Sequence, residues 1–188
     1  MTTLPRIGVL IGSLQTKGTS RKIARALQDI LAPRLTLEIV EIGDLPLYNP
    51  ERDAEDVPAW DAFRSAVAPL DGILFVTPEY NRSVPAALKN AIDVGSRPQG
   101  ASVWASKPAG IVSHSPGMIG GFGANHHLRQ SLVFLDMPAM QQPETYLGHS
   151  PMLFDDHGAL IDGPGRTILT AFANALVAWV ALHRPAAV

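Results

Sequence analysis

The chain has 188 residues, of which 46% are hydrophobic and only 17% are charged, and its formal net charge is -2. This composition excludes a disordered chain and argues against a protein that binds nucleic acid mainly through phosphate contacts. Because the chain contains no cysteine, disulfides, thiolate catalysis, iron–sulfur clusters and cysteine zinc sites are excluded as well. The length fits a single domain that covers residues 1–188.

The amino-terminal half of the chain alternates predicted strands with predicted helices. Short apolar or β-rich runs predict strands at residues 6–12, 35–42 and 71–77. A helix with Thr19 or Ser20 as its N-cap follows the first strand and ends near Ala32. A second helix begins near Pro58, because proline is favoured in the first turn.

The carboxyl-terminal half continues the alternation. Further strands are predicted at 107–114 and, as a short fifth strand, at 137–141. Further helices are predicted from Pro85 to Gly95, from about Ala124 to Leu135, and from Pro164 onward. We expect the inward face of the last helix to carry Ile168, Phe172, Leu176 and Trp179 or Val180.

Short apolar strands that alternate with helices predict a parallel sheet covered by helices on both faces. The first residues lack the cationic start and long apolar stretch of a signal peptide. No apolar run approaches the roughly 20 residues of a membrane span. We therefore expect a protein of the cytoplasm that does not enter a membrane.

In an open parallel sheet, ligands bind beyond the carboxyl ends of the strands, where the strand order reverses. The segment after the first strand, GSLQTKGTSR at 12–21, is rich in glycine and hydroxyl groups and leads into a helix. Free backbone N–H groups and the helix dipole make it a candidate phosphate site, and an ordinary capped loop is the alternative. It is not a Walker A loop, since five residues separate Gly12 from Gly18, and GxGxxG is absent.

The segments after the third and fourth strands also suit a ligand. In TPEYNRSVPAALKNAID at 77–93, Tyr80 offers a flat face and Asn81 an amide for the rim of a planar heterocycle, unless this turn merely starts the next helix. In the later segment, glycines leave the backbone bare for close approach of a ligand, unless the segment is a flexible linker. These are Gly117, Gly120, Gly121 and Gly123. In the strand order 2-1-3-4-5 the three segments are neighbours.

These segments resemble the NAD(P)H-dependent FMN reductases of the flavodoxin-like superfamily, which include bacterial quinone, azo-dye and chromate reductases. The first segment is similar to that family's GSLR-x-G-S loop, and the most specific match is the ungapped TPEYN-x-S-x-P-x-x-LKNAID motif. PLYN at 46–49 and SPG…GG…HLRQ at 115–130 also match, so that the resemblance runs from Arg6 to Glu144.

The resemblance implies a flavodoxin-like α/β fold: a doubly wound, five-stranded parallel sheet of order 2-1-3-4-5 with helices on both faces, holding a non-covalent FMN. It implies that the FMN phosphate lies on Ser13, Gln15, Thr19 and Ser20. One border of the isoalloxazine ring would be formed by Pro78, Glu79, Tyr80 and Asn81. The other edge would be supported by Ser113, Ser115, Gly117, Gly120 and Gly121.

The implied reaction is hydride transfer from NADPH or NADH to FMN, followed by two-electron reduction of a quinone or a similar acceptor (an azo dye, chromate or another metal oxyanion, or free flavin). Both substrates would use one pocket in turn, with no catalytic acid or base and no metal. Such proteins are usually homodimers or homotetramers. The alternatives are a flavodoxin-type electron carrier, which is commonly far more acidic than this chain, and a flavin-free interaction scaffold.

Three positions depart from the residues that are frequent in the family. Gln15 stands where arginine is frequent, which removes one charge partner of the phosphate, and we expect Lys17 or Arg21 to compensate. Val94 stands where tryptophan is frequent, and Gly123 where arginine is frequent. We expect the residues at positions 94 and 123 to affect the nicotinamide or acceptor pocket and the subunit interface.

Overall fold

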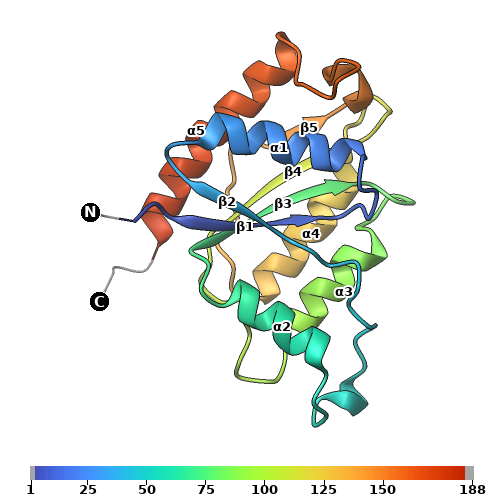
Figure 1. Ribbon diagram of the computed structural model, residues 1–188, viewed down its shortest axis with the longest axis vertical. Helices are drawn as coiled ribbons and strands as arrows, with labels where there is room; N and C mark the ends of the chain where they lie inside the picture. The colour runs from blue at the N-terminus through green and yellow to red at the C-terminus, as the bar shows by residue number, and fades with distance from the viewer. Residues whose placement is uncertain (1–2, 185–188) are drawn as a thin grey trace.

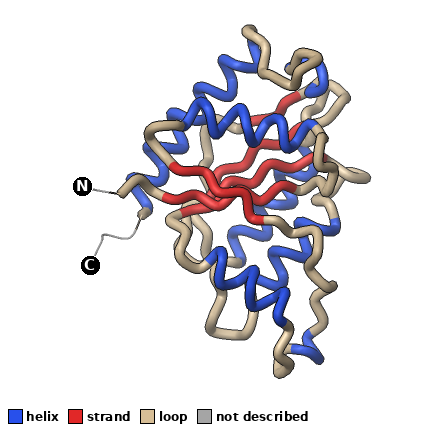
Figure 2. The backbone as a smooth tube through the Cα atoms, viewed as in Figure 1, coloured by secondary structure: helices blue, strands red, loops and turns tan. Residues whose placement is uncertain are grey.

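The structure is a computed structural model that describes residues 3–184 (Figure 1). Its centre is a sheet of five parallel strands in the order β2-β1-β3-β4-β5, which lies between two layers of helices (Figure 2). The strands are β1 (Arg6–Ile11), β2 (Thr36–Val40), β3 (Gly72–Pro78), β4 (Ala109–His114) and β5 (Thr145–Leu147). The predicted strand order is confirmed.

Helices cover both faces of the sheet. On one face lie α1 (Thr19–Leu31) and α5 (Pro164–His183). On the other face lie α2 (Pro58–Val67), α3 (Ala86–Gly95) and α4 (Phe122–Phe134). Two short 3-10 helices, η1 (Pro50–Arg52) and η2 (Ser150–Leu153), lie in the connections. Two neighbouring parallel strands need a long crossover connection, which is usually a helix. This requirement explains both the alternation of strands and helices in the sequence and the helical layers on the two faces.

The central strand β3 is buried on both sides. Leu74 and Val76 pack with α1 and α5, whereas Ile73 and Phe75 pack with the helices of the other face. Since successive side chains of a strand point to opposite faces, a strand covered on both must be an apolar run without polar alternation. The same packing keeps β3 from sliding along its neighbours and so fixes where it ends.

The predicted fifth strand at 137–141 is wrong. Within it Ala139 makes one isolated parallel bridge to Ala109, and β5 begins only at Thr145. The chain between these two points contains Pro143, which has no backbone N–H to donate to a ladder. The connection therefore leaves the sheet after one bridge and returns further along β4.

The inward face of α5 starts one residue later than predicted. Ile168 is 41% exposed, and Leu169 takes its place in the core. Phe172, Leu176 and Val180 are buried as predicted. Spacings of three and four residues both fit one face of a helix, so the pattern alone does not choose between Ile168 and Leu169 as the partner of Phe172.

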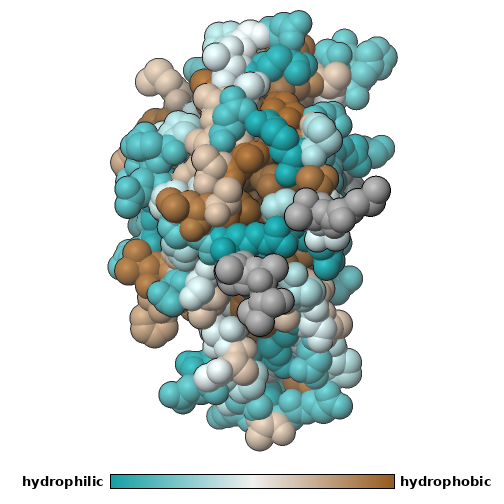
Figure 3. Space-filling model, turned by 90° about the vertical axis from the view of Figure 1, so that its left-hand side faces the viewer, coloured by the Kyte–Doolittle hydropathy of each residue, from teal (hydrophilic) through white to brown (hydrophobic). Residues whose placement is uncertain are grey.

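By length and composition alone, α5 is able to cross a membrane, since it has 20 residues and its most apolar window has a mean hydropathy of 1.4. A core helix passes the same test, and the inward side chains of α5 belong to the hydrophobic core. Figure 3 shows hydrophobic side chains gathered at mid-height on the side of the molecule where α5 ends in Figure 1. Leu182, near the end of α5, is 74% exposed and contributes apolar surface.

Candidate functional site

The carboxyl ends of β1, β3 and β4 lie side by side, toward the right of the sheet in Figure 1. Ile11 pairs with Val76, and Thr77 pairs with Ser113, so the three strands end at nearly the same level. The segments that follow them meet at this edge. They are the first loop (12–18), the third loop (79–85) and the fourth loop (115–121).

The first loop leads into a helix end that suits an anion. α1 begins at Thr19 and its N-cap is Gly18, not Thr19 or Ser20 as predicted. Gly18 has no side chain with which to cap the helix, and the first turn of α1 holds no acidic residue. Its backbone N–H groups and the positive end of the helix dipole are therefore available to a phosphate.

Two of the four residues predicted to hold a phosphate turn their hydroxyl groups into the protein. Ser20 is buried, and its Oγ lies 2.7 Å from Nε2 of His114. Ser13 Oγ accepts the backbone N–H of Gln15 at 3.3 Å and so shapes the first loop. Gln15 is exposed and Thr19 is half-buried. The side chains that remain at the surface of the loop are those of Gln15 and Thr19.

Arg21 is already engaged by a carboxylate. Each of its two Nη atoms lies 2.9 Å from a carboxylate oxygen of Glu41. The hydrogen bonds from Arg21 lower the pKa of the Glu41 carboxyl. Lys17 is exposed on the first loop and pairs with no acid in residues 3–184. Of the two cations expected to compensate for Gln15, Lys17 is the one that remains free.

The third loop carries a two-residue turn. The backbone N–H of Tyr80 donates to the carbonyl of Ser83 at 3.1 Å, and the N–H of Ser83 donates back to Tyr80 at 3.0 Å. Between them, Asn81 and Arg82 have φ values of 51° and 66°, as in a type I′ turn. Pro78 is buried at the end of β3, whereas Tyr80 and Asn81 are exposed. A flat ring and an amide therefore project from the edge where the sequence predicted them.

A cavity of about 460 Å³ lies between the first and third loops. It is lined by Gly12, Leu14, Gln15, Tyr80, Pro85, Ala86 and Ala87. Its volume is typical of small-molecule sites. Since the first loop runs from this cavity to the uncapped end of α1, the arrangement fits a ligand with a flat ring and a phosphate.

The hydroxyl groups of Ser113, at the end of β4, and of Ser115 hold the fourth loop in place. Ser113 is fully buried and donates to the carbonyl of Gly120 at 2.9 Å. The side-chain amide of Asn125 donates to Ser113 Oγ at 3.2 Å. Ser115 donates to the carbonyl of Gly117 at 2.9 Å. These side chains shape the loop, and the exposed backbone at Gly117 is what the loop offers to a ligand.

Two glycines of this loop are required by the protein itself. Gly120 and Gly121 have φ values of 66° and 79°. A Cβ on Gly120 would lie 2.6 Å from the carbonyl carbon of Tyr146, and one on Gly121 would lie 3.0 Å from the carbonyl oxygen of His114. From the sequence, both glycines are expected to allow the approach of a ligand. The structure gives another reason, which is the close packing of the loop on β4 and β5.

Two buried polar side chains, those of His114 and Asn90, hold segments around the site in place and were not predicted from the sequence. Besides Ser20, His114 contacts Ser150, whose Oγ lies 3.0 Å from Nδ1. Burial lowers the pKa of His114 to about 4. Asn90 of α3 accepts the backbone N–H of Tyr48 at 2.8 Å and so fixes the PLYN segment. Both residues could have been found from the sequence, because each is a polar residue at a position where the strand or helix pattern requires burial.

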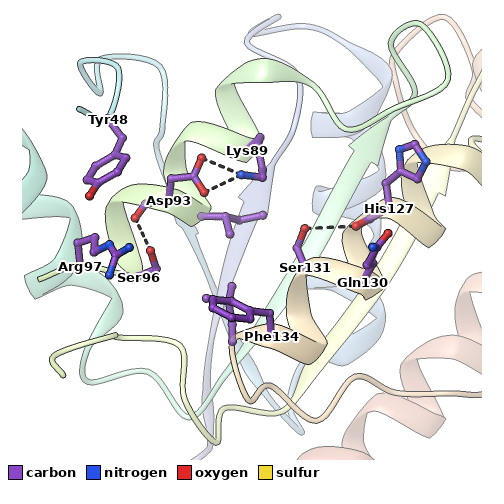
Figure 4. A pocket seen from close by; sticks show the side chains of 11 residues that line it. Tyr48, Lys89, Asp93, Ser96, Arg97, His127, Gln130, Ser131 and Phe134 are labelled. Carbon is purple, nitrogen blue, oxygen red and sulfur yellow. Dashed lines mark hydrogen bonds and ion pairs between the residues drawn. The ribbon is translucent and has the colours of Figure 1, made fainter. Parts of the chain in front are cut away.

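A second cavity, of about 390 Å³, lies between α3 and α4 (Figure 4). Lys89 and Asp93 pair on its α3 side, with Nζ 2.6 Å from Oδ1, and Phe134 lies on its α4 side. None of the residues predicted to bind FMN lines this cavity. It is therefore a separate surface feature, whose most exposed apolar side chain is that of Phe134.

Comparison with known proteins identifies the chain's relatives. A family model described as NADPH-dependent FMN reductase matches residues 5–151. The chain belongs to this family. It is 56% identical over 185 residues to a quinone reductase of Pseudomonas putida, covering 98% of this chain and 99% of that protein. It is 40% identical over 175 residues to a 2-hydroxy-1,4-benzoquinone reductase of Burkholderia sp., covering 93% and 96%.

A solved structure shares the fold of this FMN reductase. FerB, a flavoenzyme NAD(P)H:(acceptor) oxidoreductase from Paracoccus denitrificans, superposes with a TM-score of 0.91 and 32% identity, covering 97% of this chain and 100% of that one. The chain is thus a flavodoxin-like oxidoreductase that uses FMN with NAD(P)H as electron donor. The uncapped end of α1 and the adjoining cavity fit that cofactor.

His114 gives the stability of this FMN reductase a pH dependence. The folded state keeps the imidazole neutral down to about pH 4, whereas the unfolded state takes up a proton below about pH 6.5. Acid therefore favours unfolding, and the contribution of His114 to the free energy of unfolding falls by about 2 kcal/mol from about pH 7.5 to pH 5.

Urea unfolding of the wild type and of His114→Gln at these two pH values measures this contribution. Glutamine keeps a donor and an acceptor but does not titrate, so we expect a smaller loss of stability in the variant. Carboxylates titrate alike in both proteins and cancel in the comparison. The same pH dependence in both proteins would contradict a buried, neutral His114.

Proposed function

We propose that this FMN reductase passes two electrons from NAD(P)H to a quinone-type acceptor. The quinone reductases to which the chain is 56% and 40% identical support this choice of acceptor. The observation that carries the proposal is the meeting of three loops at one edge of the sheet, with a cavity between the first and third of them beside an uncapped helix end.

At the phosphate end we assign two kinds of contact. The backbone N–H groups of the first turn of α1 bind the phosphate directly, and Lys17, Gln15 and Thr19 add side-chain donors. Ser20 acts through the shape of the loop, because its hydroxyl contacts His114, whereas Ser13 shapes the loop by accepting the N–H of Gln15 and keeps its own O–H as a donor.

At the ring end we assign one border to the third loop and the other to the fourth. The third loop contributes Pro78, Glu79, Tyr80 and Asn81. The fourth loop contributes backbone at Ser115, Gly117, Gly120 and Gly121, and Ser113 holds it in place.

FMN, when bound, would supply the redox chemistry, which is hydride acceptance from NAD(P)H and two-electron reduction of the acceptor. The chain binds and orients the two substrates in turn. Tyr80 lines the cavity with an exposed ring, against which a nicotinamide or a quinone packs. The cavity lining holds no carboxylate, imidazole or amine, so we assign no catalytic acid or base.

Steady-state kinetics test this shared site. With NADPH and benzoquinone varied together, we expect parallel double-reciprocal lines, because the oxidised nucleotide leaves before the quinone enters. Converging lines, which require both substrates to be bound at once, would contradict the proposal.

The purified protein should also be yellow and lose its colour on addition of NADPH without oxygen. An electron carrier would bleach poorly, and a flavin-free scaffold would be colourless.

The charge around the first loop sets the affinity for FMN. Gln15→Arg adds a donor at the phosphate, and we expect an FMN Kd about fivefold lower, which corresponds to about 1 kcal/mol. Lys17→Glu should raise the Kd by about tenfold at low ionic strength. Fluorescence titration of the apoprotein measures both. Arg25→Glu, which makes the same charge change on the exposed side of α1, is the control. Equal effects of Lys17→Glu and Arg25→Glu would contradict a local contact.

We also propose that the protein is a homodimer or homotetramer of the cytoplasm. Val133 and Phe134, at the end of α4 near the cavity of Figure 4, are 79% and 90% exposed. Clustered apolar side chains of this size are typical of surfaces that another protein covers. We expect sedimentation velocity to show an oligomer that Phe134→Glu dissociates. A wild type that sediments as a monomer at micromolar concentration would contradict this.

A further inference from the structure

The turn of the third loop holds an unfavourable backbone conformation. Asn81 and Arg82 both have positive φ values, of 51° and 66°. Asparagine tolerates this region, but the second position of a type I′ turn favours glycine, because a Cβ crowds the neighbouring carbonyl there. An arginine at this position therefore needs an interaction that offsets the strain.

Glu79 provides that interaction and also reaches a second element. Its side chain is only 9% exposed. Oε1 accepts a hydrogen bond from Nη1 of Arg82 at 3.1 Å. Oε2 accepts the backbone N–H of Ala124 at 3.1 Å. Ala124 is the third residue of α4, whose own N-cap, Gly121, has no side chain. One half-buried carboxylate thus pairs with the strained turn, through an Arg82 side chain that is 73% exposed, and caps the helix that follows the fourth loop.

Gly123 allows this contact to form. A Cβ on Gly123 would lie 2.8 Å from the carbonyl oxygen of Arg82 and 2.9 Å from Oε2 of Glu79. The turn therefore packs directly on the first turn of α4. A side chain at position 123, where arginine is frequent in the family, would push the two apart. The small residue at position 123 thus leaves room for the turn that contains Arg82 to pack on α4.

We propose that Glu79 and Arg82 are positioning residues that clamp the third loop to α4. The clamp sets the distance between Tyr80 and Asn81 on one side and the fourth loop on the other. Since these two loops border the isoalloxazine ring in the proposed function, on which this inference rests, the clamp fixes the width of the slot for the ring.

Arg82→Gly separates a positioning role from a structural one. Glycine relieves the strain at φ 66° but removes the ion pair. We expect a melting temperature of the apoprotein equal to or above that of the wild type, together with an FMN Kd at least about threefold higher. The visible absorption of the bound flavin should shift as well. Gly123→Ala changes no charge and forces the third loop away from α4, so it should weaken FMN binding in the same direction.

Arg64→Ala is the matched control. It removes a guanidinium that pairs with Asp61, also three residues away in sequence, on α2. We expect it to leave the FMN Kd and the flavin spectrum unchanged. Wild-type Kd values and spectra in both Arg82→Gly and Gly123→Ala would overturn the clamp while leaving the proposed function intact. So would an Arg82→Gly variant that loses thermal stability in step with FMN affinity. A wild type that takes up no FMN would instead overturn the proposed function, and the clamp with it.

Discussion

Parallel pairing of β1, β3 and β4 is the constraint on which the site depends. The three strands run in one direction and are buried by helices on both faces, so the loops that follow them emerge together at one edge. In the proposed function, the segment at 12–18 grips the phosphate and the segments at 79–85 and 115–121 border the ring, although these segments lie far apart in sequence. No single segment provides both features, and the core packing of the strands keeps the segments at a fixed distance.

Polar contacts inside the protein fix the loops that follow the packed strands. His114 joins the first turn of α1 to η2 through two serine hydroxyls, Ser113 holds the fourth loop, and Glu79 ties the third loop to α4. A polar group without water is costly to leave unpaired, so each of these contacts restricts its loop to one arrangement. The surface left to a ligand then consists of backbone N–H groups, glycine, the apolar side chains that line the cavity, and the exposed Tyr80 and Asn81. Such a surface suits a cofactor that brings its own chemistry and needs mainly to be held.

The sequence predicted the architecture because a strand covered on both faces must be an apolar run, and β1, β3 and β4 are such runs. It misplaced β5, whose three residues form no run and follow a proline, and it chose Ile168 over Leu169 because both fit helical spacing. The sequence predicted which loops meet at the site, but it did not predict which contacts their side chains make. A hydroxyl in the first turn of a helix looks the same in sequence whether it faces a phosphate or a histidine. Only the fold brings Ser20 to His114, 94 residues away.

Titration of the apoprotein with FMN and with riboflavin, which has the same ring without the phosphate, tests most directly whether the three loops form one site with a phosphate grip at α1. We predict one FMN per chain, and binding of riboflavin at least about tenfold weaker, because the charge-assisted hydrogen bonds at the helix end are lost. Equal affinity for the two flavins would contradict the phosphate grip, and no uptake of FMN would contradict the site as a whole.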